Sequence, residues 1–381
     1  MRSTIVDIDL DAIAANAQAL RTAAAAELIA VVKADAYGHG AVPVARTVLE
    51  AGAAMLAVAT IDEGAVLRQS GIDAPILVLL GPSDRDDADT AVMLDLACAV
   101  WDLDRARLLS AAGSAQRPAR VHFKIDTGLT RLGSPLAEAA GRVAAIRALP
   151  HLAVEGLFTH YATADDPDDS FAREQLASFE EFVRAVPDRP RWIHAAASAG
   201  VAALGAQPVC NAIRPGLALY GLAPAAHLAD RVPLRPALAW RSAVHRVVDV
   251  PAGTGVSYGH EFRLPRPGRI ATVPVGYGDG LSRRARGAEL LVRGRRLPIV
   301  GRVCMDLVML DATGHEAEAG DEVVLIGEQA GARRTADDLA RECGTISYEV
   351  VTAIRDRVPK RYLRGGRPVA WKTLAGGYTP S

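Results

Sequence analysis

Lysine is nearly absent from this sequence. The basic side chains are almost all arginine, and the only lysines are Lys33, Lys124, Lys360 and Lys372. Because the composition scatters so few lysines by chance, each lysine in an apolar context is informative.

Other features are missing as well. The four cysteines lack CxxC spacing and the density of a disulfide scaffold, so we expect reduced thiols and no metal site. Residues 1–20 alternate apolar and charged side chains and then become helical, without the apolar core of a secretory signal or a membrane span. We therefore expect a cytoplasmic protein. With a net charge of -1, the chain lacks the excess of positive charge that is typical of proteins that bind nucleic acid or anionic lipid. This favours a small-molecule partner.

The length of 381 residues exceeds one compact core, and half of the residues are hydrophobic. We expect two domains, a larger one at residues 1–230 and a smaller one at residues 231–381. The N-terminal strand, residues 1–10, is expected to join the smaller domain.

The larger domain alternates short apolar runs with longer segments of helical period, which is typical of parallel strands joined by crossover helices. Eight such runs recur at intervals of roughly 25 to 30 residues, and no GxGxxG follows the first. This pattern predicts an α/β fold in the form of an eight-fold β/α (TIM-like) barrel. It disfavours the alternative, an open dinucleotide-binding sheet. The expected strands are Leu28–Val32, Met55–Ala59, Pro75–Leu80, Leu96–Val100, Val121–Ile125, Val154–Phe158, Arg191–His194 and Asn211–Ile213.

After Ala223–Pro236 the sequence changes to alternating, β-branched runs broken by glycine and proline. This pattern predicts a mainly antiparallel β domain. One helix is expected there at Thr335–Arg341, with Thr335 as its N-cap.

Polar residues directly follow the predicted barrel strands. They are Lys33, Lys124 with Arg131, His160, Ser198 and Arg214. In a barrel of this kind the carboxyl ends of the strands converge on one face, where the active site lies. A lysine at a strand end is more often a surface residue, but a desolvated amine with a lowered pKa can condense with an aldehyde cofactor. The scarcity of lysine and the neighbouring Tyr37 favour this second interpretation of Lys33.

The segment VVKADAYGHG around Lys33 resembles the pyridoxal-phosphate signature of alanine racemases. Further blocks resemble motifs of that family in the family's order. They are VHFKIDTGLTRLG, FTHYATAD, HAAASAG, NAIRPGLALYGLAP, GTGVSYGHEF, VPVGYGDGLSRR, GRVCMD and TISYEV. Small departures are Asp35, Ala197, Gly278 and Leu307, none of which replaces a catalytic group.

The resemblance implies an isomerase that interconverts L- and D-alanine, with pyridoxal 5'-phosphate held by Lys33. Inversion at a carbon needs proton removal on one face and delivery on the other, so two groups are required. The resemblance assigns these roles to Lys33 and to Tyr258 of a second copy of the chain, in a homodimer with shared sites. A tyrosine ordinarily has a pKa of about 10 and needs nearby donors to act near neutrality, for which His160 and Arg214 are expected.

The resemblance also assigns the remaining contacts. Arg214 donates to the pyridine nitrogen and, because guanidinium keeps its proton, leaves that nitrogen unprotonated, which suits racemisation. The other cofactor contacts are Tyr37, Ser198, Gly216, Leu217 and Tyr348. Arg131 and Met305 are expected to bind the substrate carboxylate, and Tyr277 and Asp306 to line the entrance. Lys124 is expected to be either carbamylated or unmodified and paired with a carboxylate.

Three other functions remain open from the sequence. A related barrel-type decarboxylase or a broad-specificity racemase would share the lysine and the cofactor, but Arg214 and Tyr258 favour racemisation. A non-catalytic protein that binds pyridoxal phosphate would not need the β domain with Tyr258, Met305 and Tyr348. The racemase prediction carries a further expectation, the supply of D-alanine for peptidoglycan, with alanine catabolism as the alternative role.

Overall fold

The structure is a computed structural model, and it describes residues 2–380 of the chain. The chain divides into two compact units. The barrel unit comprises Ala12–Ala36 and Ala41–Pro236. The sheet unit comprises the residues up to Asp11, Tyr37–Gly40 and the residues from Ala237 onward.

Eight parallel strands close into a barrel in the barrel unit, as the sequence predicts. Their order is β5-β4-β3-β2-β10-β9-β8-β6, and pairing of β5 with β6, in which Cys98 faces Val121, closes the ring. The strands are β2 (Glu27–Val31), β3 (Met55–Val58), β4 (Ile76–Val78), β5 (Ala97–Val100), β6 (Ala119–Asp126), β8 (Leu152–Phe158), β9 (Trp192–His194) and β10 (Ala212–Ile213). A short β7 (Ser134–Pro135) pairs with the end of β6.

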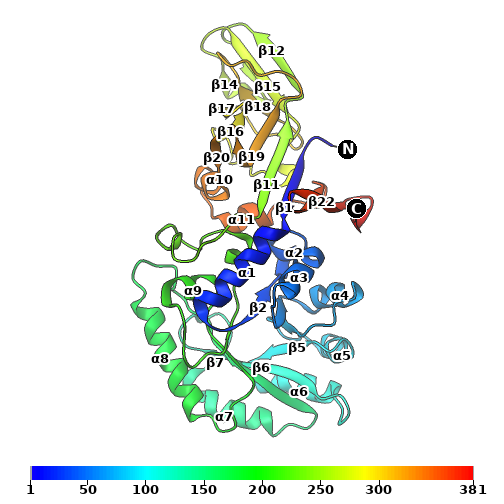
Figure 1. Ribbon diagram of the computed structural model, residues 1–381, viewed down its shortest axis with the longest axis vertical. Coiled ribbons are helices and arrows are strands. Elements are labelled where there is room, and N and C mark those ends of the chain that lie inside the picture. The colour runs from blue at the N-terminus through cyan, green and yellow to red at the C-terminus, as the bar shows by residue number, and fades with distance from the viewer. Residues whose placement is uncertain (1, 381) are drawn as a thin grey trace. The chain divides into compact units, whose positions relative to one another are not determined.

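Helices lie outside these strands (Figure 1). They are α1 (Leu10–Ala24), α3 (Ala41–Glu50), α4 (Ile61–Gln69), α5 (Arg85–Met93), α6 (Leu103–Ala112), α7 (Leu136–Arg147), α8 (Ser170–Ala185) and α9 (Ser198–Leu204). Side chains cap several of their N-termini: Thr60 and Glu63 form a capping box on α4, and Asp84 and Asp102 cap α5 and α6. Shorter helical turns are α2 (Lys33–Tyr37), η1 (Leu217–Tyr220) and η2 (Ala226–Leu228).

The sheet unit is mainly antiparallel β structure, which confirms the predicted second architecture. Its largest sheet has the order β12-β15-β18-β17-β16-β19-β11-β1-β21-β22-β23, with β20 paired to β19. The strands are β1 (Ile5–Asp9), β11 (Leu238–Ala243), β12 (Arg246–Val250), β15 (Gly268–Val273), β16 (Glu289–Val292), β17 (Arg295–Val300), β18 (Val308–Asp311), β19 (Glu322–Gln329), β20 (Ala332–Arg334), β21 (Lys360–Arg364), β22 (Arg367–Thr373) and β23 (Gly377–Pro380). A separate hairpin joins β13 (Gly255–Val256) to β14 (Phe262–Arg263).

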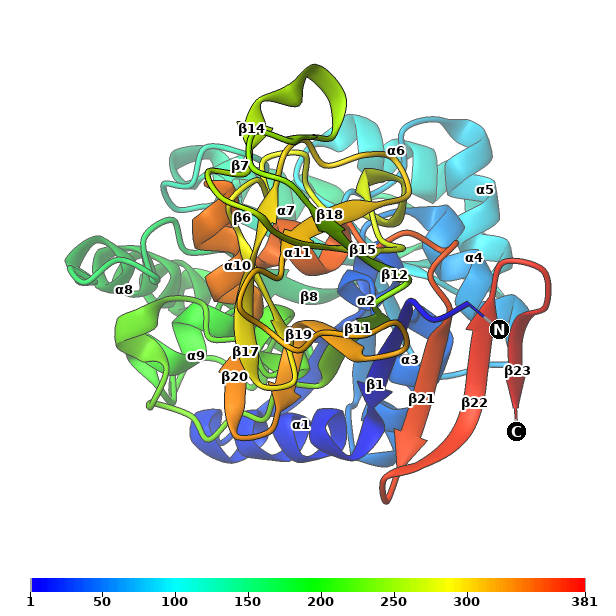
Figure 2. The ribbon, with the colours of Figure 1, turned by 90° about the horizontal axis from the view of Figure 1, so that it is seen from above.

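The N-terminal strand β1 lies within this sheet, antiparallel to β11 and parallel to β21. Figure 2 shows β21, β22 and β23 side by side next to it. The predicted helix is present as α10 (Ala336–Cys343), with a capping box between Thr335 and Asp338. It is followed by α11 (Ser347–Thr352), and η3 (Tyr258–His260) and η4 (Tyr277–Asp279) complete the unit.

Two expectations about absent features can be compared with the described residues. All four cysteines are free thiols in the structure. Among residues 2–380, no helix combines the length and the apolar character needed to cross a membrane.

Candidate active site

Lys33 lies directly after β2, where the amide of Val32 makes the last bond of the strand, 2.8 Å from the carbonyl oxygen of Ala57. Its side chain is half-buried. Burial lowers the pKa of the Lys33 amine, the positive charge of Arg131 lowers it further, and Glu63 opposes the shift. The amine is therefore more available as a nucleophile than an exposed lysine would be.

The chain after Lys33 makes a left-handed turn. Ala34, Asp35 and Ala36 have φ of 52°, 51° and 54°, a region that costs roughly 1–2 kcal/mol for each L-residue. Side chains hold the turn, because the amide of Ala34 donates to Glu63 Oε1 at 2.6 Å and the amide of Ala41 to Asp35 Oδ1 at 2.8 Å. Backbone held in a strained conformation by its surroundings is typical of functional sites. Sequence reasoning missed both this turn and the role of Glu63, which reads only as a helix-capping residue.

Arg214 follows β10 and is almost completely buried, with 4% of its surface exposed. Its Nη1 donates to His194 Nδ1 at 2.6 Å and to the His194 carbonyl at 2.9 Å. Its Nη2 donates to the carbonyls of Thr159 and Ala195, at 2.6 and 3.0 Å. No other residue in the described chain accepts a hydrogen bond from its Nε–H. One donor of a rigidly held guanidinium thus remains for a ligand.

His160 follows β8 and lies next to Arg214, with Nδ1 3.3 Å from Nη2. Because an arginine only donates, Nδ1 of His160 is an acceptor and its proton is on Nε2. Burial and the charges of Arg214 and Arg131 hold the pKa of His160 well below its usual range. His160 is therefore a neutral imidazole that can donate through Nε2.

Ser198 begins α9 after β9 and is buried. Its Oγ accepts from the amides of Gly216 and Ala218, both at 3.1 Å, at the start of η1. The hydroxyl hydrogen of Ser198 remains as a donor. Gly216 and Leu217 are buried beside it, so these three predicted residues come together, with the amide of Gly216 bonded to the Ser198 hydroxyl oxygen.

Lys124 and Arg131 come from β6 and the loop after it. Lys124 is 5% exposed, and burial, Arg214 and Arg131 together lower its pKa to about 8. Asp126 shapes the loop that leads to Arg131, because its Oδ1 accepts from the amides of Gly128 and Thr130 at 2.9 and 3.1 Å. Arg131 is exposed, and its charge acts on the pKa of Lys33 as well as on that of Lys124. The strand ends therefore form a cationic group suited to an anionic ligand.

The remaining predicted residues lie in the sheet unit. Tyr258, in η3, is 70% exposed, and Met305 is 52% exposed. Tyr277 lies close to Met305 in the fold, because the amide of Gly278 donates to the Met305 carbonyl at 2.8 Å. Asp306 forms an ion pair with Arg357 at 2.6 Å. The structure thus brings Tyr277, Met305 and Asp306 together on one part of the sheet unit.

Tyr37 and Tyr348 also lie together in the sheet unit, with ring centroids 6.2 Å apart. Gly38 makes this packing possible: its φ is 81°, and a Cβ there would lie 2.3 Å from the carbonyl oxygen of Val351 in α11. Burial, with Tyr348 nearby, raises the pKa of Tyr37. The Tyr37 hydroxyl therefore keeps its proton and can donate to an anion.

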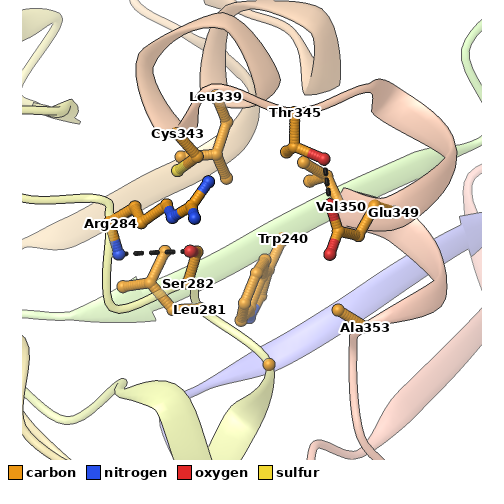
Figure 3. Close-up of a pocket in the computed structure, with 11 residues that line it drawn as sticks. Trp240, Leu281, Ser282, Arg284, Leu339, Cys343, Thr345, Glu349, Val350 and Ala353 are labelled. Carbon is orange, nitrogen blue, oxygen red and sulfur yellow. Dashed lines mark hydrogen bonds between the residues drawn. The ribbon is translucent and has the colours of Figure 1, made fainter.

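A cavity of about 400 Å³ in the sheet unit contains none of the predicted site residues. Figure 3 shows Arg284 and Glu349 on opposite sides of it and Trp240 between them. The indole Nε1 of Trp240 is sealed from solvent and has no hydrogen-bond partner in the described chain. The polar groups at the rim bond to one another, Thr345 to Glu349 and the amide of Arg284 to Ser282. None of the predicted residues at the barrel strand ends lines this cavity.

Among residues 2–380, no group of three or more His, Cys, Asp or Glu side chains is arranged to hold a metal ion. The cationic strand ends would also repel one.

Known proteins resemble the whole chain. Residues 8–224 match the family model of the alanine racemase N-terminal domain, and residues 237–362 match that of the C-terminal domain. The alanine racemase of Symbiobacterium thermophilum is 44% identical over 369 residues, covering 95% of this chain and 97% of the relative. That of Geobacter sulfurreducens is 42% identical over 375 residues, covering 95% of this chain and 97% of the relative.

Solved structures agree. The alanine racemase of Bacillus anthracis with bound L-Ala-P superposes with a TM-score of 0.90 at 38% identity, covering 98% of each chain. The alanine racemase of Streptomyces lavendulae gives a TM-score of 0.88 at 38% identity, covering 96% of this chain and 98% of that one. A decarboxylase, a broad-specificity racemase or a non-catalytic binding protein is not favoured by these relatives. The chain belongs to the alanine racemase family, isomerases that interconvert L-alanine and D-alanine.

Proposed function

We propose that the barrel strand ends bind pyridoxal 5'-phosphate, with Lys33 as the residue that condenses with its aldehyde and releases water. The observation that carries this proposal is the half-buried amine of Lys33, whose pKa is lowered by burial and by Arg131. A neutral amine is the form that attacks an aldehyde. When bound, the cofactor supplies an electron-withdrawing ring that makes the α-hydrogen of alanine acidic.

The donors of the barrel unit fit this cofactor. Arg214 has one N–H without a partner in the described chain, and a guanidinium can donate to a pyridine nitrogen without protonating it. Ser198 retains its hydroxyl hydrogen beside Gly216 and Leu217, which suits a phosphate. We assign Tyr37 and Tyr348 to the phosphate as well, because the raised pKa of Tyr37 keeps its hydroxyl a donor.

Two groups are needed to invert the α-carbon. We assign one proton transfer to the Nζ of Lys33 and the other to the hydroxyl of Tyr258 of the partner subunit, with His160 as its supporting donor and Arg214 as the supporting positive charge. Tyr258 is 70% exposed in a single chain, and a large aromatic with that exposure is available to a second copy. The proposed assembly is therefore a homodimer with two shared sites.

The substrate carboxylate requires donors of its own. We assign it to the planar fork of Arg131 and to the backbone amide of Met305 of the partner subunit. Met305 is 52% exposed, as a residue that completes a neighbouring site would be. Tyr277 and Asp306 are proposed to line the entrance.

We propose that Lys124 is carbamylated: its amine attacks carbon dioxide, forms an N–C bond and releases one proton. A pKa of about 8 leaves part of this amine neutral near physiological pH. The resulting carboxylate would partly neutralise the cationic group and orient Arg131.

Borohydride reduction of the purified protein with its cofactor, followed by peptide mapping, tests the main assignment. Because the chain has only four lysines, the labelled peptide identifies the residue unambiguously. We expect the label on the peptide that contains Lys33, and a Lys124→Gln variant, as the control, should keep it. A label on a peptide without Lys33 would overturn the proposal. The cytoplasmic location and the role in peptidoglycan supply stay predictions.

A further inference from the structure

Two fully buried histidines lie behind Arg214 inside the barrel. His194 is on β9 and His122 on β6, and both have no exposed surface. His194 Nδ1 is 2.6 Å from Nη1 of Arg214, and His194 Nε2 is 2.8 Å from His122 Nδ1. The three side chains therefore form one continuous row of hydrogen bonds.

The direction of these bonds is determined at the arginine. A guanidinium has donors and no acceptor, so His194 Nδ1 must accept. The proton of a neutral His194 is then on Nε2, which donates to His122 Nδ1. His122 in turn accepts at Nδ1 and has its own proton on Nε2. An imidazolium at either position would place two donors face to face.

Burial reinforces this arrangement. It lowers the pKa of His122 to about 3, with a smaller effect from the charge of Arg214, and it holds the pKa of His194 well below its usual range. Both rings are thus neutral: His194 accepts from Arg214, and His122 accepts from His194.

The barrel interior is shaped around His122. A Cβ at Gly156 on β8 would lie 2.4 Å from His122 Nδ1, so only glycine leaves room for the ring. The pairing of β6 with β8 shifts register between Val121 and His122, at the same place. On β8 as well, the ring of Phe158 stacks on His194 at 4.9 Å, which holds the second imidazole in plane.

We infer that His122 is a positioning residue for Arg214: by accepting the Nε2–H of His194, it keeps His194 Nδ1 unprotonated as the acceptor that holds Nη1. Without that acceptor, His194 can move its proton to Nδ1, where it would repel the arginine. The consequence for catalysis rests on the proposed function, because the Nε–H of Arg214 meets a pyridine nitrogen only if that cofactor binds here. His122 itself touches neither substrate nor cofactor in this scheme.

Two matched variants of the full-length protein test the inference. The amide side chain introduced by His122→Asn retains an acceptor oxygen near the position of Nδ1, whereas His122→Leu retains the bulk without an acceptor. With histidine labelled with ¹⁵N, nitrogen shifts report the tautomer of His194 with or without cofactor. We expect the Nε2–H tautomer in the wild type and in His122→Asn, and its loss in His122→Leu.

The functional readouts should follow the same order. At saturating cofactor, His122→Leu should lower kcat about tenfold, equivalent to about 1.4 kcal/mol, and weaken cofactor binding. The KM for alanine should change little, and His122→Asn should restore most of kcat. If His122→Leu fails to fold, the tautomer of His194 in the wild type and in His122→Asn still tests the inference.

Each contrary result has a distinct meaning. A Nδ1–H tautomer of His194 in the wild type, or an unchanged tautomer and kcat in His122→Leu, would overturn the inference. A wild-type protein that shows the expected tautomer but binds no pyridoxal phosphate would instead refute the proposed function and leave the histidine arrangement standing.

Discussion

Lys124 Nζ lies 5.6 Å from the centre of the Phe158 ring, and within the described chain it forms no ion pair with a carboxylate. Asp126 acts on it only as a weaker opposing charge. A buried amine without a paired anion lies in an unfavourable environment when protonated. Of the two states that the sequence left open for Lys124, we therefore propose the carbamylated one, which creates a new anion.

Carbamylation of Lys124 should therefore depend on pH. The reacting form is the neutral amine, which predominates above its pKa of about 8. At a constant concentration of dissolved ¹³CO₂, the carbamate carbon signal should rise between pH 7 and pH 9. Lys124→Gln should abolish it, and no signal at pH 9 would contradict the proposal.

Replacement of Tyr258 by phenylalanine removes one of the two proton carriers and leaves Lys33 in place. The visible absorbance of the lysine-bound cofactor should stay near that of the wild type, while turnover falls by about 10²-fold or more in at least one direction. Circular dichroism of L- and D-alanine reactions measures both directions. Unchanged turnover would refute the two-base assignment.

A shared site predicts complementation between two inactive variants. In a mixed dimer of Lys33→Ala and Tyr258→Phe chains, one site combines the intact Lys33 of one chain with the intact Tyr258 of the other. Random exchange makes half of the dimers mixed, each with one intact site, so about one quarter of the wild-type activity should return. If both groups came from the same chain, mixing would restore nothing.

Ser198→Ala should affect both stability and cofactor binding. The variant leaves the amides of Gly216 and Ala218 without their acceptor, which should lower the free energy of unfolding by about 1–3 kcal/mol. It should also weaken binding of pyridoxal phosphate about tenfold, measured by spectroscopic titration. Ser110→Ala is the matched control: Ser110 is buried and bonds to the Pro150 carbonyl, so its loss should cost stability without changing cofactor affinity.

The two buried histidines behind Arg214 predict loss of stability in mild acid. The pKa of His122 is lowered to about 3 and that of His194 well below its usual range, while an unfolded histidine titrates near 6.5. Below about pH 6.5 these two histidines therefore bind protons in the unfolded chain but stay neutral in the folded chain. The stability that these groups contribute is present above about pH 6.5 and is lost as the pH falls.

Each histidine that stays neutral in the folded protein should make the free energy of unfolding about 2 kcal/mol lower at pH 5 than at pH 7. Denaturant unfolding at the two pH values measures the sum over all titrating groups, the buried His160 included, and His122→Asn should reduce the difference by about 2 kcal/mol. A variant with the same pH dependence as the wild type would show that folding does not lower the pKa of His122.

Local patterns in the sequence determined the barrel and the candidate residues that follow its strands, whereas the family resemblance assigned the others. Parallel strands buried on both faces read as short apolar runs, and all eight appear where those runs occur. The capping pattern at Thr335 likewise predicted α10, because both partners of a capping box lie within one turn. Lys33, Ser198 and Arg214 could be singled out because each directly follows a strand.

Only the tertiary structure revealed the left-handed turn after Lys33, the bond from Ala34 to Glu63, and the row from Arg214 through His194 to His122. A polar residue inside an apolar strand is recognisable in the sequence as unusual. The sequence does not show which residue it forms a hydrogen bond with. His122 and His194 lie on different strands, and Gly156 makes room for one of them from a third. The sequence alone determined which residues end the strands; closure of the barrel decided which of them meet, because that contact depends on strand register across the ring and not on any local pattern.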